Sequence, residues 1–217
     1  MAVQRTLIAQ TVVLVTENIN TGMFSQYWFI QNKIFKPEEI LQDSVFAPGV
    51  SIVSSPDCHI ICEPSRIQMA IKSDSQSEAY SCVKDKLAKM VNAINVLPVN
   101  AMGVNFIWKV QDTEQDIHFL SAYFFGDNDS DIYSYFNKSD ARYGAYFSQN
   151  IDENTRLKLD IKPVNSFENN TKVEFITASF NYHRDLQIEK PSQQIEEQLK
   201  KWSNLRQNSN KVVCLLK

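Results

Sequence analysis

The sequence predicts an α+β fold, and three observations support this prediction. Short apolar segments rich in Val, Ile and Thr alternate with segments in which apolar residues recur every three or four positions. Turn-forming residues separate these segments. In the first half their order is strand, helix, strand, strand, helix, strand, which matches the ferredoxin-like β-α-β-β-α-β unit.

Each element of the first half is predicted from periodicity and from its flanking residues. Ser75 and Glu78 form a capping-box pattern that opens the second helix. Pro64 interrupts a strand pattern, so we expect an edge position or a bulge there. The predicted elements are a strand over 7–15, a helix over 23–35, strands over 46–54 and 58–71, a helix over 75–94 and a strand over 99–110.

The second half is predicted to be mainly antiparallel β structure, closed by a C-terminal helix. The segment 115–125 is apolar and fits a strand or a helix equally well. Pro163 is expected to end a strand. The other predicted elements are strands over 132–136, 143–150, 156–161 and 172–183, a hairpin loop over 150–154, a helix over 193–207 and a last strand over 212–216.

The domain prediction divides the chain into residues 1–111, the ferredoxin-like half, and residues 112–217, the antiparallel half. One continuous core and two separable domains both fit this length. The first part has equal numbers of acidic and basic residues, and the second has thirteen basic and sixteen acidic ones. Nucleic-acid binding is therefore disfavoured, although a basic stripe within a neutral total stays open.

The cysteines and the N-terminal segment indicate a cytoplasmic protein. Four cysteines at positions 58, 62, 82 and 214 are too few and too scattered for a disulfide scaffold. We expect all four to be reduced, with Cys82 and Cys214 buried. The apolar run that begins at Leu7 is too short for a membrane span, and no signal-peptide cleavage pattern follows it.

Two patterns resemble metal sites, and neither is complete. Cys58, His59 and Cys62 include the right ligand types, but on a strand His59 faces away from the two thiols. The segment 127–131 resembles the start of a calcium loop, but Ile132 stands at the glycine position and Lys138 at the glutamate position. A chain of this size buries a sufficient core unaided, so we expect no cofactor and no metal.

Four residues support an enzymatic alternative, a metal-dependent nuclease or RNA-processing enzyme. Asp160 and Lys162, with Asp152 upstream, form an acid-x-Lys pattern in which carboxylates hold Mg²⁺ and the lysine activates water. His183 is the best acid–base candidate because Asp185 can orient its ring. The non-catalytic interpretation of the acid-x-Lys pattern is a solvated strand face. For His183 it is a strand end with charged neighbours.

Aromatic residues support the leading hypothesis, a non-enzymatic protein-binding or complex-forming protein. The chain has thirteen Phe, eight Tyr and three Trp, and aromatic side chains are enriched at interfaces. The expected partner is another protein or a second copy of the chain. The candidate partner-binding residues flank the acidic turn, and they are Tyr133, Tyr135, Phe136, Tyr143 and Tyr146.

Three segments resemble a sporadically distributed family of bacterial proteins of unknown function, and they are 99–107, 180–186 and the helix over 194–202. The strand over 99–107, which follows a helix, is similar to that family's "Gly-Leu-Arg-Tyr-Ile-Asn" strand, although Asn105 or no residue stands at the arginine. The segment 180–186, followed by the acidic helix that ends at Trp202, is similar to the family's C-terminal region. The resemblance covers about a third of the chain. It implies a bacterial or phage-linked cytoplasmic protein, with no established activity or catalytic residues.

Overall fold

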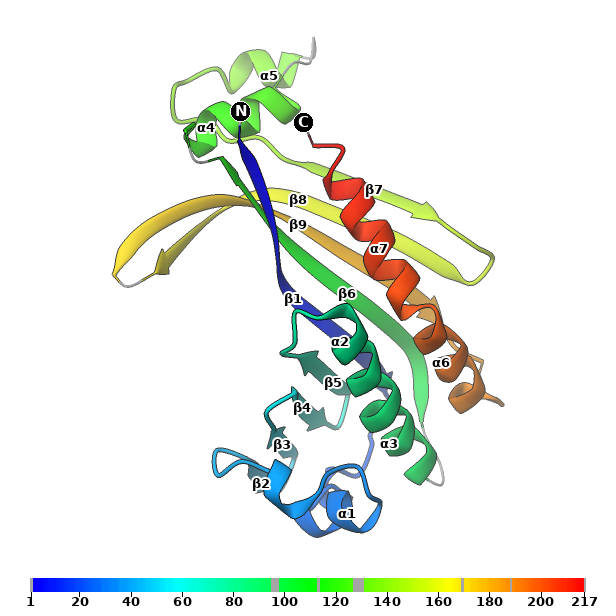
Figure 1. Ribbon diagram of the computed structural model, residues 1–217. Coiled ribbons are helices and arrows are strands. Elements are labelled where there is room, and N and C mark those ends of the chain that lie inside the picture. Colours follow the sequence, from blue (N-terminus) through cyan, green and yellow to red (C-terminus); the bar gives the residue numbers. More distant parts are fainter. Residues whose placement is uncertain are drawn as a thin grey trace.

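The computed structural model describes residues 2–94, 98–112, 114–126, 131–168, 170–187 and 189–216. In these residues nine strands form one sheet in the order β2-β3-β4-β5-β1-β6-β9-β8-β7 (Figure 1). Every neighbouring pair is antiparallel. The strands are β1 (Val3–Thr16), β2 (Val45–Ala47), β3 (Val50–Ser54), β4 (Cys58–Glu63), β5 (Arg66–Ile71), β6 (Val99–Asp112), β7 (Ala145–Asn150), β8 (Thr155–Glu168) and β9 (Thr171–Asp185).

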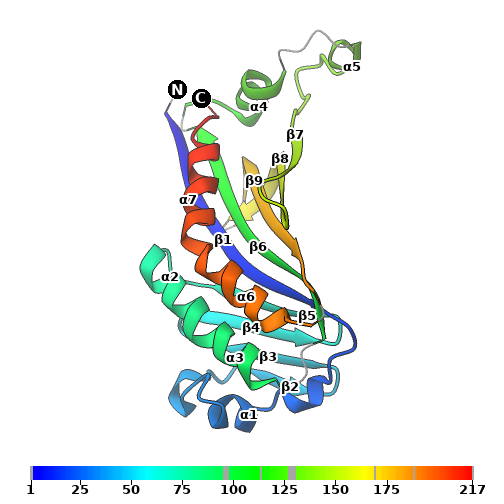
Figure 2. The same ribbon diagram turned by 90° about the vertical axis from the view of Figure 1, so that its right-hand side faces the viewer.

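Helices α2, α3, α6 and α7 lie along one face of this sheet (Figures 1 and 2). A π-helical turn over Val83–Leu87 joins α2 to α3, and 3-10 turns cover Thr21–Met23 and Pro37–Glu39. The helices are α1 (Gln26–Gln31), α2 (Gln76–Cys82), α3 (Ala88–Ala93), α4 (Ile117–Phe125), α5 (Asp131–Tyr135), α6 (Pro191–Lys200) and α7 (Trp202–Val213).

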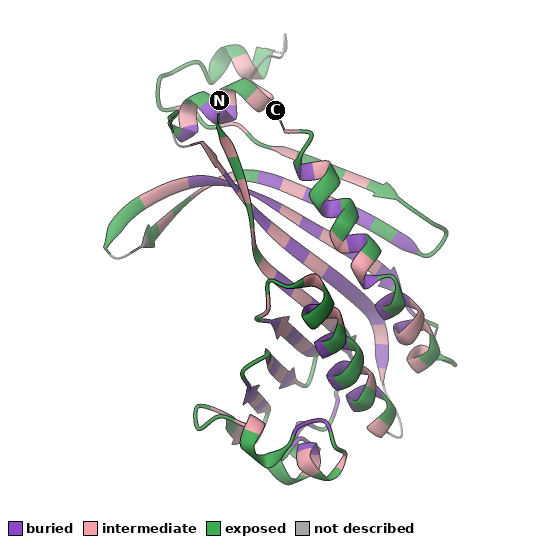
Figure 3. Cartoon of the chain, viewed as in Figure 1, coloured by how far each residue is buried: buried purple, intermediate pink, exposed green. Residues whose placement is uncertain are grey.

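The core fills the space between these helices and the sheet. Along β6, residues facing the helices are buried and their neighbours are mostly half-buried, as the alternating colours of Figure 3 show. Val104, Phe106 and Trp108 belong to the buried set. Trp202, at the start of α7, lies edge-on to Phe106 with ring centroids 5.5 Å apart. Apolar burial of this kind is the main force that holds the helices on the sheet.

Polar contacts fix α7 along the sheet. The Trp108 indole Nε1 donates a hydrogen bond to Ser209 Oγ at 3.0 Å, inside the core. Arg5 Nε on β1 donates to the Val213 carbonyl at 3.1 Å. Val213 ends α7, so its carbonyl has no partner among the residues of that helix, and it accepts the arginine N–H together with the Leu216 N–H at 3.2 Å.

The predicted α+β fold with a ferredoxin-like unit is wrong: the described residues form a mostly β structure, built on one nine-stranded antiparallel sheet. The first crossover helix of the predicted unit is not there. In the segment 23–35 only Gln26–Gln31 is α-helical, and Lys33 has a positive φ of 55° just beyond it. The aromatic residues that suggested a long helix instead form a compact cluster, in which Phe29 contacts Phe24, Trp28, Phe35 and Phe46. Consequently β1 is antiparallel to both β5 and β6, whereas a βαβ crossover requires parallel strands.

Pro64 marks a turn rather than a bulge or an edge position. The run predicted as one strand over 58–71 is two strands, β4 and β5, whose last pair is Glu63 with Arg66. Pro64 and Ser65 therefore form the connection, and the Pro64 carbonyl accepts a hydrogen bond from Thr16 Oγ1 at 2.9 Å. Proline suits this place because its ring fixes the backbone dihedral φ for a turn, and it has no backbone N–H that would need an acceptor.

Three predictions for the second half also need correction. The segment 132–136 lies in helix α5 and its end rather than in a strand, and the segment 212–216 continues α7 and its last turn. Strand β8 runs through Pro163, which pairs with Ile176 of β9. Pro163 is tolerated because β7 ends its pairing at Ile161, so the proline lies where β8 has become the sheet edge.

Other elements of the second half agree with the sequence. The ambiguous segment 115–125 is helical as α4, and residues 151–154 connect β7 to β8. The helix predicted over 193–207 is present as α6 and α7. Because β6 pairs with β1 on one side and β9 on the other, both parts of the chain contribute to one sheet; the division at residues 111 and 112 stays a prediction. Among the described residues, no helix combines the length and apolarity needed to cross a membrane.

Candidate interaction surface

Exposed large apolar side chains gather at one end of the molecule, on α4, α5, β7 and the turn after α7. We call this surface the apolar end; both chain termini lie close to its helix α4 (Figures 1 and 2). Tyr135 is 81% exposed, Phe147 55% and Phe136 54%. The exposed members of the apolar end are Phe119, Tyr123, Ile132, Tyr135, Phe136, Tyr146, Phe147 and Leu215.

Helix α4 presents two of these rings because its other side is anchored. Asp116 caps the helix by accepting a hydrogen bond from the Phe119 N–H at 2.8 Å. Ile117 and Leu120 are buried, and α4 contacts β6 and β9. One turn apart on the outer side, Phe119 and Tyr123 stack with ring centroids 6.2 Å apart. The helix therefore exposes aromatic surface as a consequence of how it is packed.

The structure brings four of the five predicted partner-binding residues together. Tyr133 and Tyr143 stack with ring centroids 5.6 Å apart, and Tyr135 lies edge-on to Phe136 at 5.3 Å. The Tyr143 hydroxyl donates a hydrogen bond to the Phe136 carbonyl. Tyr146 is separate from this cluster, on β7, where it is 63% exposed.

An apolar groove of about 410 Å³ lies between strands β7 to β9 and the end of α7, and Phe125 of α4 also lines it. Phe147 lines it and pairs across the strands with Leu159. Phe180 and Leu216 also contribute to its walls. Phe147 lies in the strand predicted over 143–150, but it is not among the predicted partner-binding residues. Those residues were predicted because they flank the acidic turn.

The four candidate nuclease residues do not converge. Lys162 and Asp160 pair with each other at 2.7 Å, and His183 pairs with Asp185 at 3.0 Å. Asp152 lies in the loop before β8, where it bonds Lys201 at 3.1 Å. Since β8 begins at residue 155, about five strand residues at 3.4 Å each separate that loop from Asp160, roughly 17 Å. A single Mg²⁺ site cannot use both carboxylates.

The Asp152 contact gives a pH-dependent prediction. Partial burial opposes ionisation, but the Asn154 backbone N–H and the Lys201 ammonium lower the pKa of Asp152 to about 2. A lowered folded-state pKa contributes stability above the unfolded-state pKa, about 3.9, and this contribution is lost as pH falls toward 2. We expect Asp152→Asn to lower the free energy of unfolding by less than about 1 kcal/mol at pH 7, because the pair is exposed.

Urea unfolding of both proteins at pH 7, 4, 3 and 2 measures this difference. It should shrink steadily between pH 4 and pH 2, and Asp43→Asn, in the exposed turn before β2, is the matched control. A difference that stays constant down to pH 2 would contradict the assigned role of the Lys201 contact.

The cysteines are free thiols, and three of the four are buried. Cys58 and Cys62 lie on the core face of β4, with His59 on the opposite face, as predicted. Burial raises the pKa of Cys62. Cys82 is buried as predicted, but Cys214 is exposed, because it follows α7 rather than lying in a core strand. Among the described residues no three His, Cys, Asp or Glu side chains are placed to hold a metal ion; residues 127–130 of the predicted acidic turn lie outside that description.

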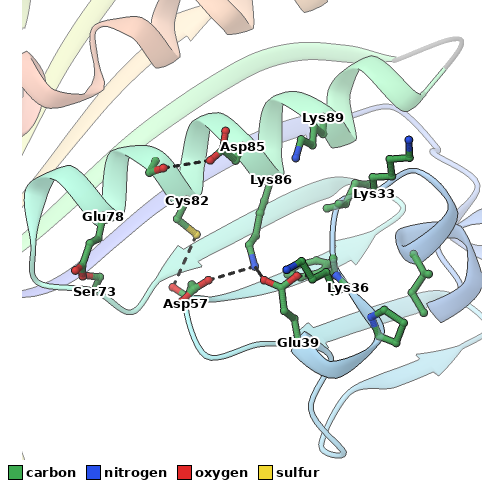
Figure 4. Close-up of a pocket in the computed structure, with 15 residues that line it drawn as sticks. Lys33, Lys36, Glu39, Asp57, Ser73, Glu78, Cys82, Asp85, Lys86 and Lys89 are labelled. Atoms are coloured by element: carbon green, nitrogen blue, oxygen red, sulfur yellow. Dashed lines mark hydrogen bonds and ion pairs between the residues drawn. The ribbon is translucent and has the colours of Figure 1, made fainter.

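A second, larger cavity of about 750 Å³ lies between the π-helical turn and the segment after α1 (Figure 4). Sequence reasoning missed its central residue, Lys86, whose ammonium bonds Glu39 at 3.1 Å and Asp57 at 3.3 Å. The ammonium also lies 4.3 Å from the centre of the Phe35 ring. Burial disfavours the charge, but the Cys58 sulfur and the Glu39 carboxylate outweigh it, so the pKa of Lys86 is raised. Two carboxylates and an aromatic ring thus hold Lys86 as a cation that links the π-helical turn to the segment after α1.

No protein-family model matches the chain, and no curated protein does so either. The functional assignment therefore depends on the geometry of the chain itself. In the described residues, that geometry combines one antiparallel sheet with many exposed large apolar side chains at the apolar end.

Proposed function

We propose that this chain is a non-enzymatic protein-binding protein that forms complexes through the apolar end. The observation that carries the proposal is the concentration of exposed aromatic and aliphatic side chains on α4, α5 and β7. Exposed apolar surface of this extent is costly to leave in water, and in monomeric proteins it commonly marks an interaction site.

The shape and chemistry of the apolar end support this proposal. Its rings are held by stacking and by the Tyr143 hydrogen bond, so little side-chain entropy is lost on binding. The neighbouring groove adds a concave apolar site, in which a partner's apolar side chain can be buried. The enzymatic alternative has weaker support, because Asp152 lies away from the Asp160–Lys162 pair and each of the two carboxylates bonds a lysine.

Affinity purification of the tagged chain from its source cells, followed by light scattering, tests the proposal. The wild-type chain should elute in an assembly heavier than its own 25.0 kDa. The double variant Tyr135→Ser/Phe136→Ser should weaken that assembly at least tenfold. Phe167→Ser is the matched control, since Phe167 is 75% exposed and lies outside the apolar end. A wild-type chain that stays monomeric and brings down no stable partner would contradict the proposal.

A further inference from the structure

We infer that β7 pairs edge to edge with β7 of a second copy of this chain, which gives a two-fold symmetric dimer with one continuous sheet. The inference rests on the proposed function, because it names the partner that the β7 side of the apolar end binds. Identical antiparallel strands can satisfy each other in this way, since a two-fold axis brings the same surface of both copies together.

Strand β7 is an unprotected sheet edge. It is the last strand of the sheet, and its residues Ala145–Asn150 include no charged residue and no proline. Natural edge strands usually carry such residues, because a free edge otherwise recruits another strand. The opposite edge, β2, differs: it has only three residues, and its Phe46 packs on Phe29 with ring centroids 6.4 Å apart.

Other stretches of the sheet also lack a partner on one side, including residues 3–10 of β1 and 162–168 of β8, but these carry Arg5 or Lys162 and Pro163. Among the described strands, β7 is thus the long free edge without a charge or a proline.

The main-chain groups that β7 presents can be assigned from its pairing with β8. Just past the strand, the Ile151 N–H donates to the Thr155 carbonyl at 2.9 Å. Hydrogen bonding alternates along an antiparallel pair, so Phe147 and Gln149 direct their main-chain groups toward β8. The main-chain groups of Tyr146, Ser148 and Asn150 consequently point outward, to the free edge.

Burial of Phe147 selects the register. Phe147 lies on the helix face of the sheet beside the groove, and 55% of its surface is exposed. A two-fold axis perpendicular to the sheet and centred at this residue places Phe147 opposite Phe147 of the partner subunit, in a close pair without hydrogen bonds between the two. The outward groups of Tyr146 then bond those of Ser148 of the partner subunit. Both grooves lie on the same side of the joined sheet, and the two rings cover each other.

The same register is complementary in charge beyond the strand. Continued outward from its centre, it brings Arg142 level with Asp152 of the partner subunit, on both sides of the axis. Both side chains are at the surface, since the Arg142 side chain is 33% exposed and that of Asp152 39%. Each side chain also has a partner in its own subunit, Arg142 with Glu174 and Asp152 with Lys201. The contact between subunits therefore joins two existing ion pairs, and it adds a modest preference for this register over one shifted along the strand.

Light scattering of the purified full-length chain tests the inference. The wild-type protein should have about twice the mass of the 25.0 kDa chain. Phe147→Lys and Phe147→Glu should each weaken the dimer at least tenfold, because each places like charges directly opposite each other. An equimolar mixture of the two variants should dimerise again, since lysine then faces glutamate. Phe167→Lys replaces a more exposed aromatic residue outside β7, and this variant should stay dimeric.

Far-ultraviolet circular dichroism of each variant establishes that the fold is kept. A monomeric wild type overturns the inference, and so does a dimer that Phe147→Lys leaves intact or that the mixture does not restore. A monomeric chain that binds a different protein, and loses it in Tyr135→Ser/Phe136→Ser, overturns the dimer and leaves the proposed function standing. A dimer that resists both Phe147 variants but dissociates in that double variant likewise overturns the β7 pairing alone.

Discussion

Replacing Trp202 by alanine should lower the free energy of unfolding by about 3–5 kcal/mol, the largest effect expected for a single substitution in the core. Trp202 is fully buried at the point where α6 ends and α7 begins. Its ring packs on Phe106 of β6, so the substitution leaves a cavity between the helices and the centre of the sheet. Equilibrium unfolding in urea, followed by circular dichroism, measures the change.

Trp202→Phe is the matched control, because it keeps an aromatic ring against Phe106. The buried indole N–H of Trp202 has no hydrogen-bond partner among the described residues, so its loss removes no bond. We expect phenylalanine to cost about 1–2 kcal/mol, mainly through the smaller volume. Equal losses for the two variants, or a loss below 1 kcal/mol for alanine, would contradict the assigned packing of this residue.

The C-terminal helices illustrate what local sequence can and cannot predict. Ile195, Leu199, Trp202 and Leu205 recur at helical spacing, and all four are buried. The predicted strand over 212–216 was wrong because a short apolar run fits either structure. There the outcome depends on tertiary contacts: Val213 is buried, and its carbonyl accepts the Arg5 hydrogen bond from β1.

The predicted topology of the first half was wrong for a related reason. Strand periodicity located most of the strands, but it says nothing about which strands pair or in which direction. The aromatic spacing around Phe29 suited a helix, and the chain uses the same residues for a cluster beside β2. Aromatic side chains can bury comparable area in either arrangement, so the spacing alone could not distinguish them.

Local sequence pointed to some residues of the candidate interaction surface and missed one that depends on long-range strand pairing. Composition and the aromatic flanks of the acidic turn pointed to Tyr133, Phe136 and Tyr143, which are close together in the fold. Phe147 was not found, because its importance depends on β7 being the last strand of the sheet. Which strand is the edge follows from long-range pairing, and no local pattern encodes it.

Gly144→Ala should detach the start of β7 from β8 and lower the free energy of unfolding by about 1–3 kcal/mol. A Cβ at this position would collide with the Ile161 carbonyl oxygen and lie 3.3 Å from the Lys162 Cα. Both are backbone atoms of β8, so neither can move aside cheaply. The first pair of the ladder, Ala145 with Ile161, must therefore open.

Hydrogen–deuterium exchange of residues 145–150 measures this opening. Gly49→Ala is the control: Gly49 has a φ of +85°, and a Cβ there would meet nothing within 4 Å. Its cost, about 1–2 kcal/mol, comes from the left-handed backbone alone and should leave exchange in β7 unchanged. In Gly144→Ala, exchange in β7 should rise more than in β6, and self-association should weaken, since a displaced edge cannot keep the register centred at Phe147. Unchanged exchange in 145–150 would show that β7 tolerates the added methyl group, and the close approach of Gly144 to β8 would then not be what positions this edge.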